Sequence, residues 1–295
     1  MRALVRGATH GVAVAVALVL APARALHAAP STVDDRIALS ANGSSLTGTG
    51  GGGGASAGWL HNFDADTLLG VAAQYQALSV SHWAFASLSG AVTRGPGDQR
   101  YTLYGQADEG AGRNGPNAFK YRIEGLGVTG TYFHRFSATL EDKQVNVEST
   151  HGNLPKLQLA YLWNPRIQTT VGHQHSFGGN LGTRLTTARI DVYASQLSFL
   201  AGGAFGQAAP ALLGQVVTQQ GPQGNITLAP HDLREGYVGI VKSFPQLRSE
   251  LTLIADYQRL SGGEGMVGNV TVLTSVSTRW TGTLNYVFHI GHHGT

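Results

Sequence analysis

Apolar and polar side chains alternate at most positions of residues 276–290. Successive side chains of a β-strand point to opposite faces, so the pattern predicts a strand with one apolar and one polar face. Strands of soluble proteins are usually about 5–6 residues long, whereas a strand that crosses a membrane needs about 9–11 tilted residues. The segment is long enough for the second role. The apolar face holds Trp280, Gly282, Leu284, Tyr286, Phe288 and Ile290, and the polar face holds Arg279, Thr281, Asn285 and His289.

The same two-residue period recurs along the chain, in residues 69–77, 157–163, 197–206 and 251–258. No helical period of comparable length follows the first 25 residues. An all-β fold is therefore predicted, with each segment forming one strand.

Short turns and longer loops alternate between these segments. Beginning near Arg36, the alternation predicts about fourteen strands, with twelve or sixteen as alternatives, and places both ends of the chain on the short-turn side. The predicted turns lie at 64–66, 95–98, 134–136, 164–166, 194–195 and 245–247. The predicted loops are 47–54, 78–81, 110–118, 150–155, 177–183, 207–233 and 261–274. Gly50 to Gly54 are predicted to form a flexible loop tip.

The first residues are basic, then apolar, and reach Ala23-Arg24-Ala25, as in a secretory signal peptide. We therefore predict a signal peptide at residues 1–25, with cleavage possibly as late as residue 29. A short periplasmic segment (26–35), a barrel (36–290) and a C-terminal tail (291–295) follow.

Charge and cysteine content narrow the function classes. Three of the 20 Lys and Arg residues lie in residues 1–25 and none of the 17 acidic residues does, so the remaining chain is balanced. A nucleic-acid partner, which requires a clustered basic face, is not expected. The chain has no cysteine, so neither disulfides nor thiolate metal sites are available.

Together these features resemble bacterial outer-membrane β-barrel proteins, the porin-like class. The final alternation of Tyr286, Phe288 and Ile290 looks like the C-terminal strand that the barrel-assembly machinery recognises in that class. The resemblance implies an antiparallel up-and-down transmembrane barrel in the outer membrane of a Gram-negative bacterium, in contact with membrane lipid. It also implies aromatic belts, here Phe63, Phe133, Trp163 and Tyr193 near the turns and Tyr75, Phe119 and Tyr257 near the loops.

If the apolar face meets lipid, residues of the opposite parity line the interior. This rule places Phe119, Tyr121 and Ile123 toward lipid and predicts a wet lumen of mixed charge. The predicted pore-lining residues are Arg100, Asp108, Lys120, Arg122, Glu124, Arg189, Asp191 and Asp256. Charged side chains in a pore set its selectivity, although the same groups could serve as ion pairs that hold the wall.

The function predicted from these residues is a passive channel for small hydrophilic solutes, without catalytic residues, cofactor or metal. One alternative is the barrel component of an envelope assembly, such as a polysaccharide-export conduit or a surface anchor. A second is a hydrolase that uses His173, His175 and Ser176, since a His base can activate a Ser nucleophile. A secreted soluble β-sandwich or soluble barrel is a further alternative for the fold.

Overall fold

The computed structural model describes residues 34–46, 50–78, 81–114, 117–147, 150–209, 220–221, 224–225, 227–228, 231–261, 264–267, 270–273 and 276–290. The predicted signal peptide, nearly all of segment 26–35, and the tail 291–295 lie outside the described residues. Within the described ranges, no helix is both long and apolar enough to cross a membrane.

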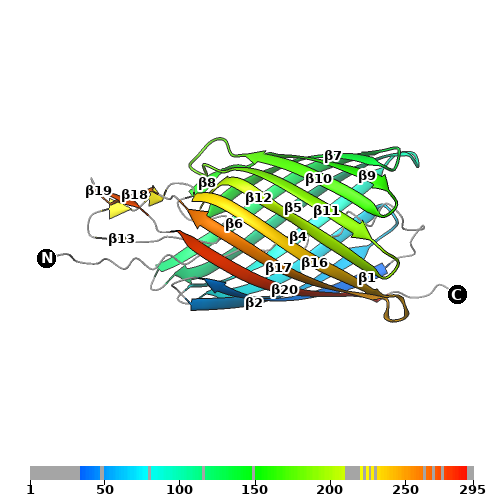
Figure 1. Cartoon of the computed structure of the whole chain (residues 1–295), viewed down its shortest axis with the longest axis horizontal. Helices are drawn as coiled ribbons and strands as arrows, with labels where there is room; N and C mark the ends of the chain where they lie inside the picture. The colour runs from blue at the N-terminus through cyan, green and yellow to red at the C-terminus, as the bar shows by residue number, and fades with distance from the viewer. Residues whose placement is uncertain are drawn as a thin grey trace.

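The described chain forms a closed antiparallel barrel of 14 strands, which confirms the predicted fold class and strand number. The strands are inclined to the long axis of the barrel (Figure 1), as closure of a sheet requires. The wall strands are β1 (Asp34–Leu46), β2 (Gly50–Asn62), β3 (Thr67–Leu78), β4 (Ser81–Arg94), β5 (Gln99–Asn114), β6 (Asn117–Tyr132), β7 (Phe136–Val147), β8 (Thr150–Asn153) with β9 (Lys156–Asn164), β10 (Ile167–His175), β11 (Arg184–Tyr193), β12 (Leu197–Ala208), β16 (His231–Phe244), β17 (Ser249–Ser261) and β20 (Ser277–Ile290).

β8 and β9 together occupy one place in the wall. β7 pairs with β9 at one end, from Phe136 to Glu141, and with β8 at the other, from Gln144 to Val147. The break between them contains Pro155, which has no N–H to give to a ladder. The predicted loop 150–155 therefore begins with a strand.

The first and last strands close the barrel. β1 pairs with β20 from Asp35 opposite Ile290 to Leu46 opposite Arg279. Two small sheets complete the strand inventory of the described residues: β13 (Gln220–Gly221) with β14 (Gly224–Asn225), and β15 (Thr227–Leu228) with β18 (Glu264–Val267) and β19 (Val270–Leu273).

All six predicted turns are confirmed, the last as the 3-10 helix η3 (Pro245–Leu247). We call this end of the barrel the turn end and the opposite end the loop end. In the first turn, the Asp66 N–H donates to Asp64 Oδ1 over 2.7 Å, and with Thr67 it lowers the pKa of the Asp64 carboxyl. Two loops are shorter than predicted, because β2 begins at Gly50 and β5 and β6 extend to Asn114 and from Asn117.

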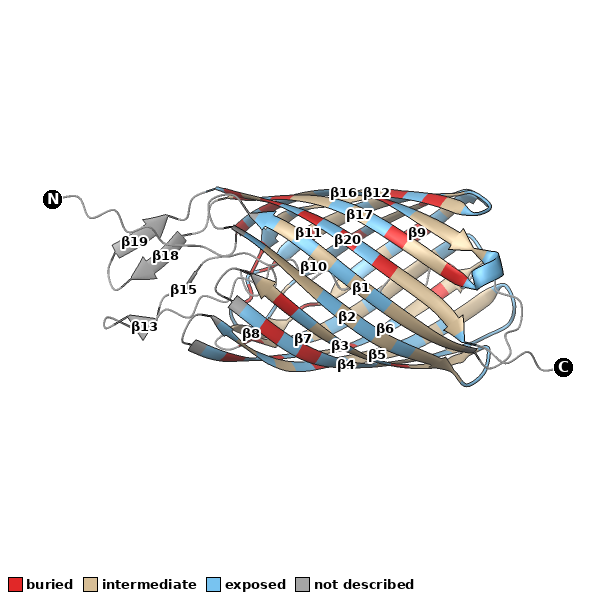
Figure 2. Ribbon diagram, turned by 90° about the horizontal axis from the view of Figure 1, so that it is seen from below, coloured by how far each residue is buried: buried red, intermediate tan, exposed pale blue. Residues whose placement is uncertain are grey.

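The alternation of faces is confirmed along most strands, as the banding by burial in Figure 2 shows. In β20, Trp280 is 61% exposed on the outer face, while its neighbour Arg279 is 1% exposed on the inner face. Exposed apolar residues therefore cover the outer wall. They include Val71, Leu88, Leu103, Leu126, Leu140, Val171, Val238 and Leu253.

Aromatic residues lie at both margins of this apolar wall. Phe63 and Trp163 are exposed near the turn end, and Tyr75 is exposed nearer the loop end. Tyr257 contacts Trp280 at a ring distance of 4.7 Å. Phe119 and Tyr193 are the exceptions, because Phe119 is buried inside and Tyr193 shares the inner face of β11 with Asp191, with its hydroxyl oxygen buried.

Candidate functional site

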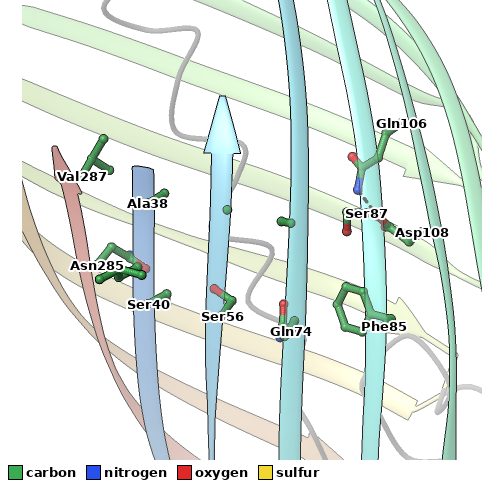
Figure 3. A pocket seen from close by; sticks show the side chains of 13 residues that line it. Ala38, Ser40, Ser56, Gln74, Phe85, Ser87, Gln106, Asp108, Asn285 and Val287 are labelled. Carbon is green, nitrogen blue, oxygen red and sulfur yellow. Dashed lines mark hydrogen bonds between the residues drawn. The ribbon is translucent and has the colours of Figure 1, made fainter. Parts of the chain in front are cut away.

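The inner wall contains a hollow of about 60 Å³ whose lining residues come from six neighbouring strands. One row of facing residues runs from Asn285 through Ser40, Ser56 and Gln74 to Phe85. The next row runs from Val287 through Ala38, Gly58, Ala72 and Ser87 to Asp108. Small side chains on β1, β2 and β3 form the floor, and the larger residues stand at its two ends (Figure 3).

Asp108 is the acidic residue of this hollow. It is 3% exposed, and its Oδ2 accepts a hydrogen bond from Gln106 Nε2 over 2.7 Å. Its Oδ1 is buried without a hydrogen-bond partner among the described residues. At the other end of the hollow, Asn285 Nδ2 and Oδ1 are also buried without a hydrogen-bond partner among the described residues. The lining thus presents buried polar atoms that protein groups leave unsatisfied.

Three further predicted pore-lining residues lie on the inner face in ion pairs. Arg189 donates from Nε to Asp191 Oδ1 over 2.9 Å, and its Nη2 contacts the same oxygen. Arg100 is paired with Asp66 near the turn end. These contacts support the alternative hypothesis that the inward charges form ion pairs that stabilise the barrel wall.

The predicted residue Asp256 belongs to a buried charge cluster with Glu235, Gln258 and Arg279. Arg279 donates to Gln258, which in turn donates from Nε2 to Glu235 Oε2 over 3.2 Å. Asp256 lies opposite Thr281 in the register and beside Glu235. The sequence prediction did not include Glu235, although the exposed positions Val238 and Ile240 on the same strand would have placed it inside.

Gly54 lies between two inward-facing amides. Asn42 and Gln76 stand on either side of it in the register and exchange two hydrogen bonds of 3.1 Å across it. A Cβ at Gly54 would meet Gln76 Oε1 at 2.1 Å. The expectation of a flexible loop tip at Gly50 to Gly54 was wrong, because these glycines form part of β2.

The predicted inward facing of Lys120, Arg122 and Glu124 was also wrong. Phe119 and Tyr121 are 5% and 6% exposed within an internal cluster, so the alternate positions point outward. Arg122 pairs with Glu124 on that outer face. The mid-strand residues Leu126 and Val128 share this face and are exposed. They fix the facing of β6, whose 16 residues exceed what a membrane crossing needs, so the charges lie toward its loop end.

Apolar side chains fill the lumen toward the loop end of β4 to β9. The internal cluster contains Trp83, Phe85, Phe119, Tyr121, Val145, Val147, Leu154, Leu181 and Ala209. Leu181 comes from residues 176–183, which we call the capping segment. Thr183 N–H donates to Ser176 Oγ over 2.7 Å, and Ala209 N–H donates to Thr183 Oγ1 over 3.0 Å. The predicted wet lumen is thus apolar in this part.

The residues of the hydrolase alternative are not brought together. His173 and His175 are exposed, and His173 Nδ1 is 3.0 Å from Thr186 Oγ1. The Ser176 hydroxyl instead accepts the Thr183 N–H. Among the described residues, no group of three or more His, Asp or Glu side chains is placed to hold a metal ion.

Comparison with known proteins supports the fold. No family model matches the chain, and no curated protein matches it in sequence. The toluene transporter TodX of Pseudomonas putida matches 95% of this chain and 95% of its own, with a TM-score of 0.54 and 10% identity. A FadL homologue of Pseudomonas aeruginosa matches 86% of this chain and 90% of its own, with a TM-score of 0.52 and 10% identity. The resemblance in fold to bacterial outer-membrane β-barrels is confirmed.

Proposed function

We propose that this chain is an outer-membrane barrel through which small hydrophilic solutes pass passively. The observation that carries the proposal is the contrast between its two faces, with an exposed apolar outer wall and polar groups of both signs inside. Lipid would cover the first, and water and solute would meet the second. The inward polar groups include Asn42, Gln76, Asp108, Glu141, Lys143, Arg189, Asp191, Glu235, Asp256 and Arg279.

The other assignments of this proposal follow from the same architecture. The turn end would face the periplasm and the loop end the exterior, as short and long connections do in bacterial barrels. Export would use the signal peptide, and the assembly machinery would recognise β20. None of the contacts among the described residues favours the envelope-assembly role or the hydrolase.

Conductance in planar lipid bilayers tests the channel. Protein refolded in detergent, checked by its altered gel mobility before boiling, is expected to give stepwise ionic currents. Vesicles that carry it should swell in iso-osmotic solutions of small sugars. An inserted, folded protein that passes neither ions nor sugars, also after removal of the capping segment, would contradict the proposal.

A second candidate function is passage of small apolar solutes. The internal aromatic cluster favours it, because Phe85 and Tyr121 stack at 5.2 Å and are buried together with Trp83. TodX, which has a similar fold, is described as a toluene transporter. Uptake of toluene into vesicles that do not swell in sugar would favour this candidate over the hydrophilic channel.

A further inference from the structure

We propose that Asp108 forms a binding subsite for the protonated amine of a polar solute. The inference deepens the proposed channel function by naming a solute class, and it rests on the hollow in the inner wall. Four features carry it: the burial of the carboxylate, its unsatisfied oxygen, the sign of the charge around it and the aromatic ring beside it.

The protein satisfies only part of this carboxylate. Asp108 Oδ1 has no hydrogen-bond partner among the described residues, and its Oδ2 accepts a hydrogen bond from the Gln106 amide. Leaving a buried charged group partly unsatisfied is costly, so a donor that reaches Oδ1 removes that cost, less the cost of its own desolvation. An ammonium group supplies up to three N–H donors and the opposite charge.

The lining selects for a cation over an anion. Among the residues that line the hollow, Asp108 is charged and no Lys or Arg is present. An anion would therefore meet a like charge without a basic group to offset it. The inward-facing Arg189 does not line the hollow and is paired with Asp191 on its own strand β11.

Phe85 adds a second feature that suits an ammonium. Ser87 is the direct cross-strand neighbour of Asp108, and Phe85 is two residues before Ser87 on β4. Phe85 and Asp108 are therefore diagonal neighbours on the inner face. Diagonal neighbours of this kind are within reach of aromatic side chains. A cation held at the carboxylate would lie beside the ring, where cation–π attraction contributes.

The remaining wall supplies hydrogen bonds for the rest of such a solute. Gln74, Ser56 and Ser40 lead away from Phe85 toward Asn285. Asn285 is five strands from Asp108, which is roughly 24 Å along the wall at about 4.8 Å per strand. A short amine therefore engages the Asp108 end alone, and only an extended solute could reach Asn285.

The test uses 1,4-diaminobutane and its neutral counterpart 1,4-butanediol as probes on the bilayer-inserted protein. Diaminobutane is expected to reduce the current in a saturable manner, and butanediol is not. Asp108→Asn keeps the shape and the hydrogen-bonding ability but removes the charge. It should raise the half-blocking concentration about tenfold, as loss of a charged hydrogen bond implies.

One control variant separates the subsite from general charge effects. Asp142→Asn makes the same change on the outer face. It should leave the block by diaminobutane unchanged. If Asp108→Asn fails to give the folded gel form, Phe85→Leu keeps the carboxylate and is expected to weaken the block about threefold. An unchanged block in whichever of these two variants folds overturns the subsite.

Equilibrium dialysis of labelled diaminobutane against the detergent-folded barrel distinguishes this inference from the channel itself. Binding that depends on Asp108 in a protein without conductance would refute the channel and keep the subsite. Conductance with binding that ignores Asp108 would keep the channel and refute the subsite.

Discussion

Glycines on the inner face decide how far neighbouring side chains can reach. Gly54 lets Asn42 and Gln76 meet across β2, and a Cβ there would also approach Tyr75 O to 2.6 Å. Gly127 gives room to the ring of Tyr104 in the same way, since a Cβ would meet Tyr104 Cζ at 2.3 Å. At both positions on the inner wall, a glycine leaves the space that a large neighbouring side chain occupies.

Gly54→Ala should lower the free energy of unfolding by about 1–3 kcal/mol, because an extra methyl forces the amide pair apart. Urea unfolding of the barrel in lipid vesicles measures the change. Gly43→Ala is the matched control, since a Cβ at Gly43 meets nothing within 4 Å. Equal stability of the two variants would show that the amide bridge contributes nothing.

Arg279→Met should destabilise the barrel by about 3–5 kcal/mol, because it leaves Glu235 and Asp256 buried without their cation. Arg122→Met removes an exposed outer arginine and should change stability little. Unfolding in urea compares them. Adding Glu235→Gln to Arg279→Met should recover part of the loss, and a triple change that also replaces Asp256 by Asn should recover more. Absence of any recovery would contradict the charge account.

At the scale of elements, the capping segment lies at the loop end, where only Leu181 and Thr183 of its residues are buried. Its Gly178, Gly179 and Gly182 have φ values of 64°, 71° and 56°, in the left-handed region that glycine adopts readily. Asn180 N–H donates to the His151 carbonyl over 2.9 Å, and Phe177 exchanges backbone hydrogen bonds of 3.0 Å with Asn153. The segment is thus held against β8.

Replacing residues 177–182 with a short Gly-Ser linker should increase single-channel conductance, because it withdraws Leu181 from the internal cluster. Phe177→Ala is the control, since that side chain is 54% exposed. Planar bilayer recordings measure both. Equal conductance in the wild type and the linker variant would show that the capping segment does not form the narrowest part of the channel.

Elements and faces differed in how far the sequence could predict them. Four of the six predicted turns contain Asp, Gly, Pro or Asn, whose local backbone preferences made these turns predictable. The facing of Asp108, Arg189 and Asp191 followed from the apolar residues beside them. The inner and outer faces of the loop-end half of β6 could not be predicted in this way. Beyond the hydrocarbon core of a membrane, charged side chains are tolerated on either face of a strand. The partners Glu235 and Asn42 depend on register between strands, which alternation does not determine.

At the scale of the whole molecule, the two ends of the barrel make an orientation experiment possible. The chain has no native cysteine, so a single introduced thiol reports one position. Phe177 is exposed at the loop end, and Asp98 is exposed in a turn at the turn end. These residues therefore mark opposite sides of the proposed membrane.

Phe177→Cys should react with a membrane-impermeant maleimide on intact cells, whereas Asp98→Cys should react only after the envelope is disrupted. Mass spectrometry of the purified protein measures the labelling. The reverse pattern would invert the orientation. Recovery of either variant from a soluble fraction without detergent would contradict the membrane location.

The seam between β1 and β20 joins the first and last strands of the described barrel, from Asp35 with Ile290 onward. The cylinder therefore closes only after residues 277–290 have been synthesised, because β20 is the partner of β1 on that side. Until then the unpaired edge of β1 is open to pairing with other chains, so the unclosed sheet is the form of this protein most prone to aggregate.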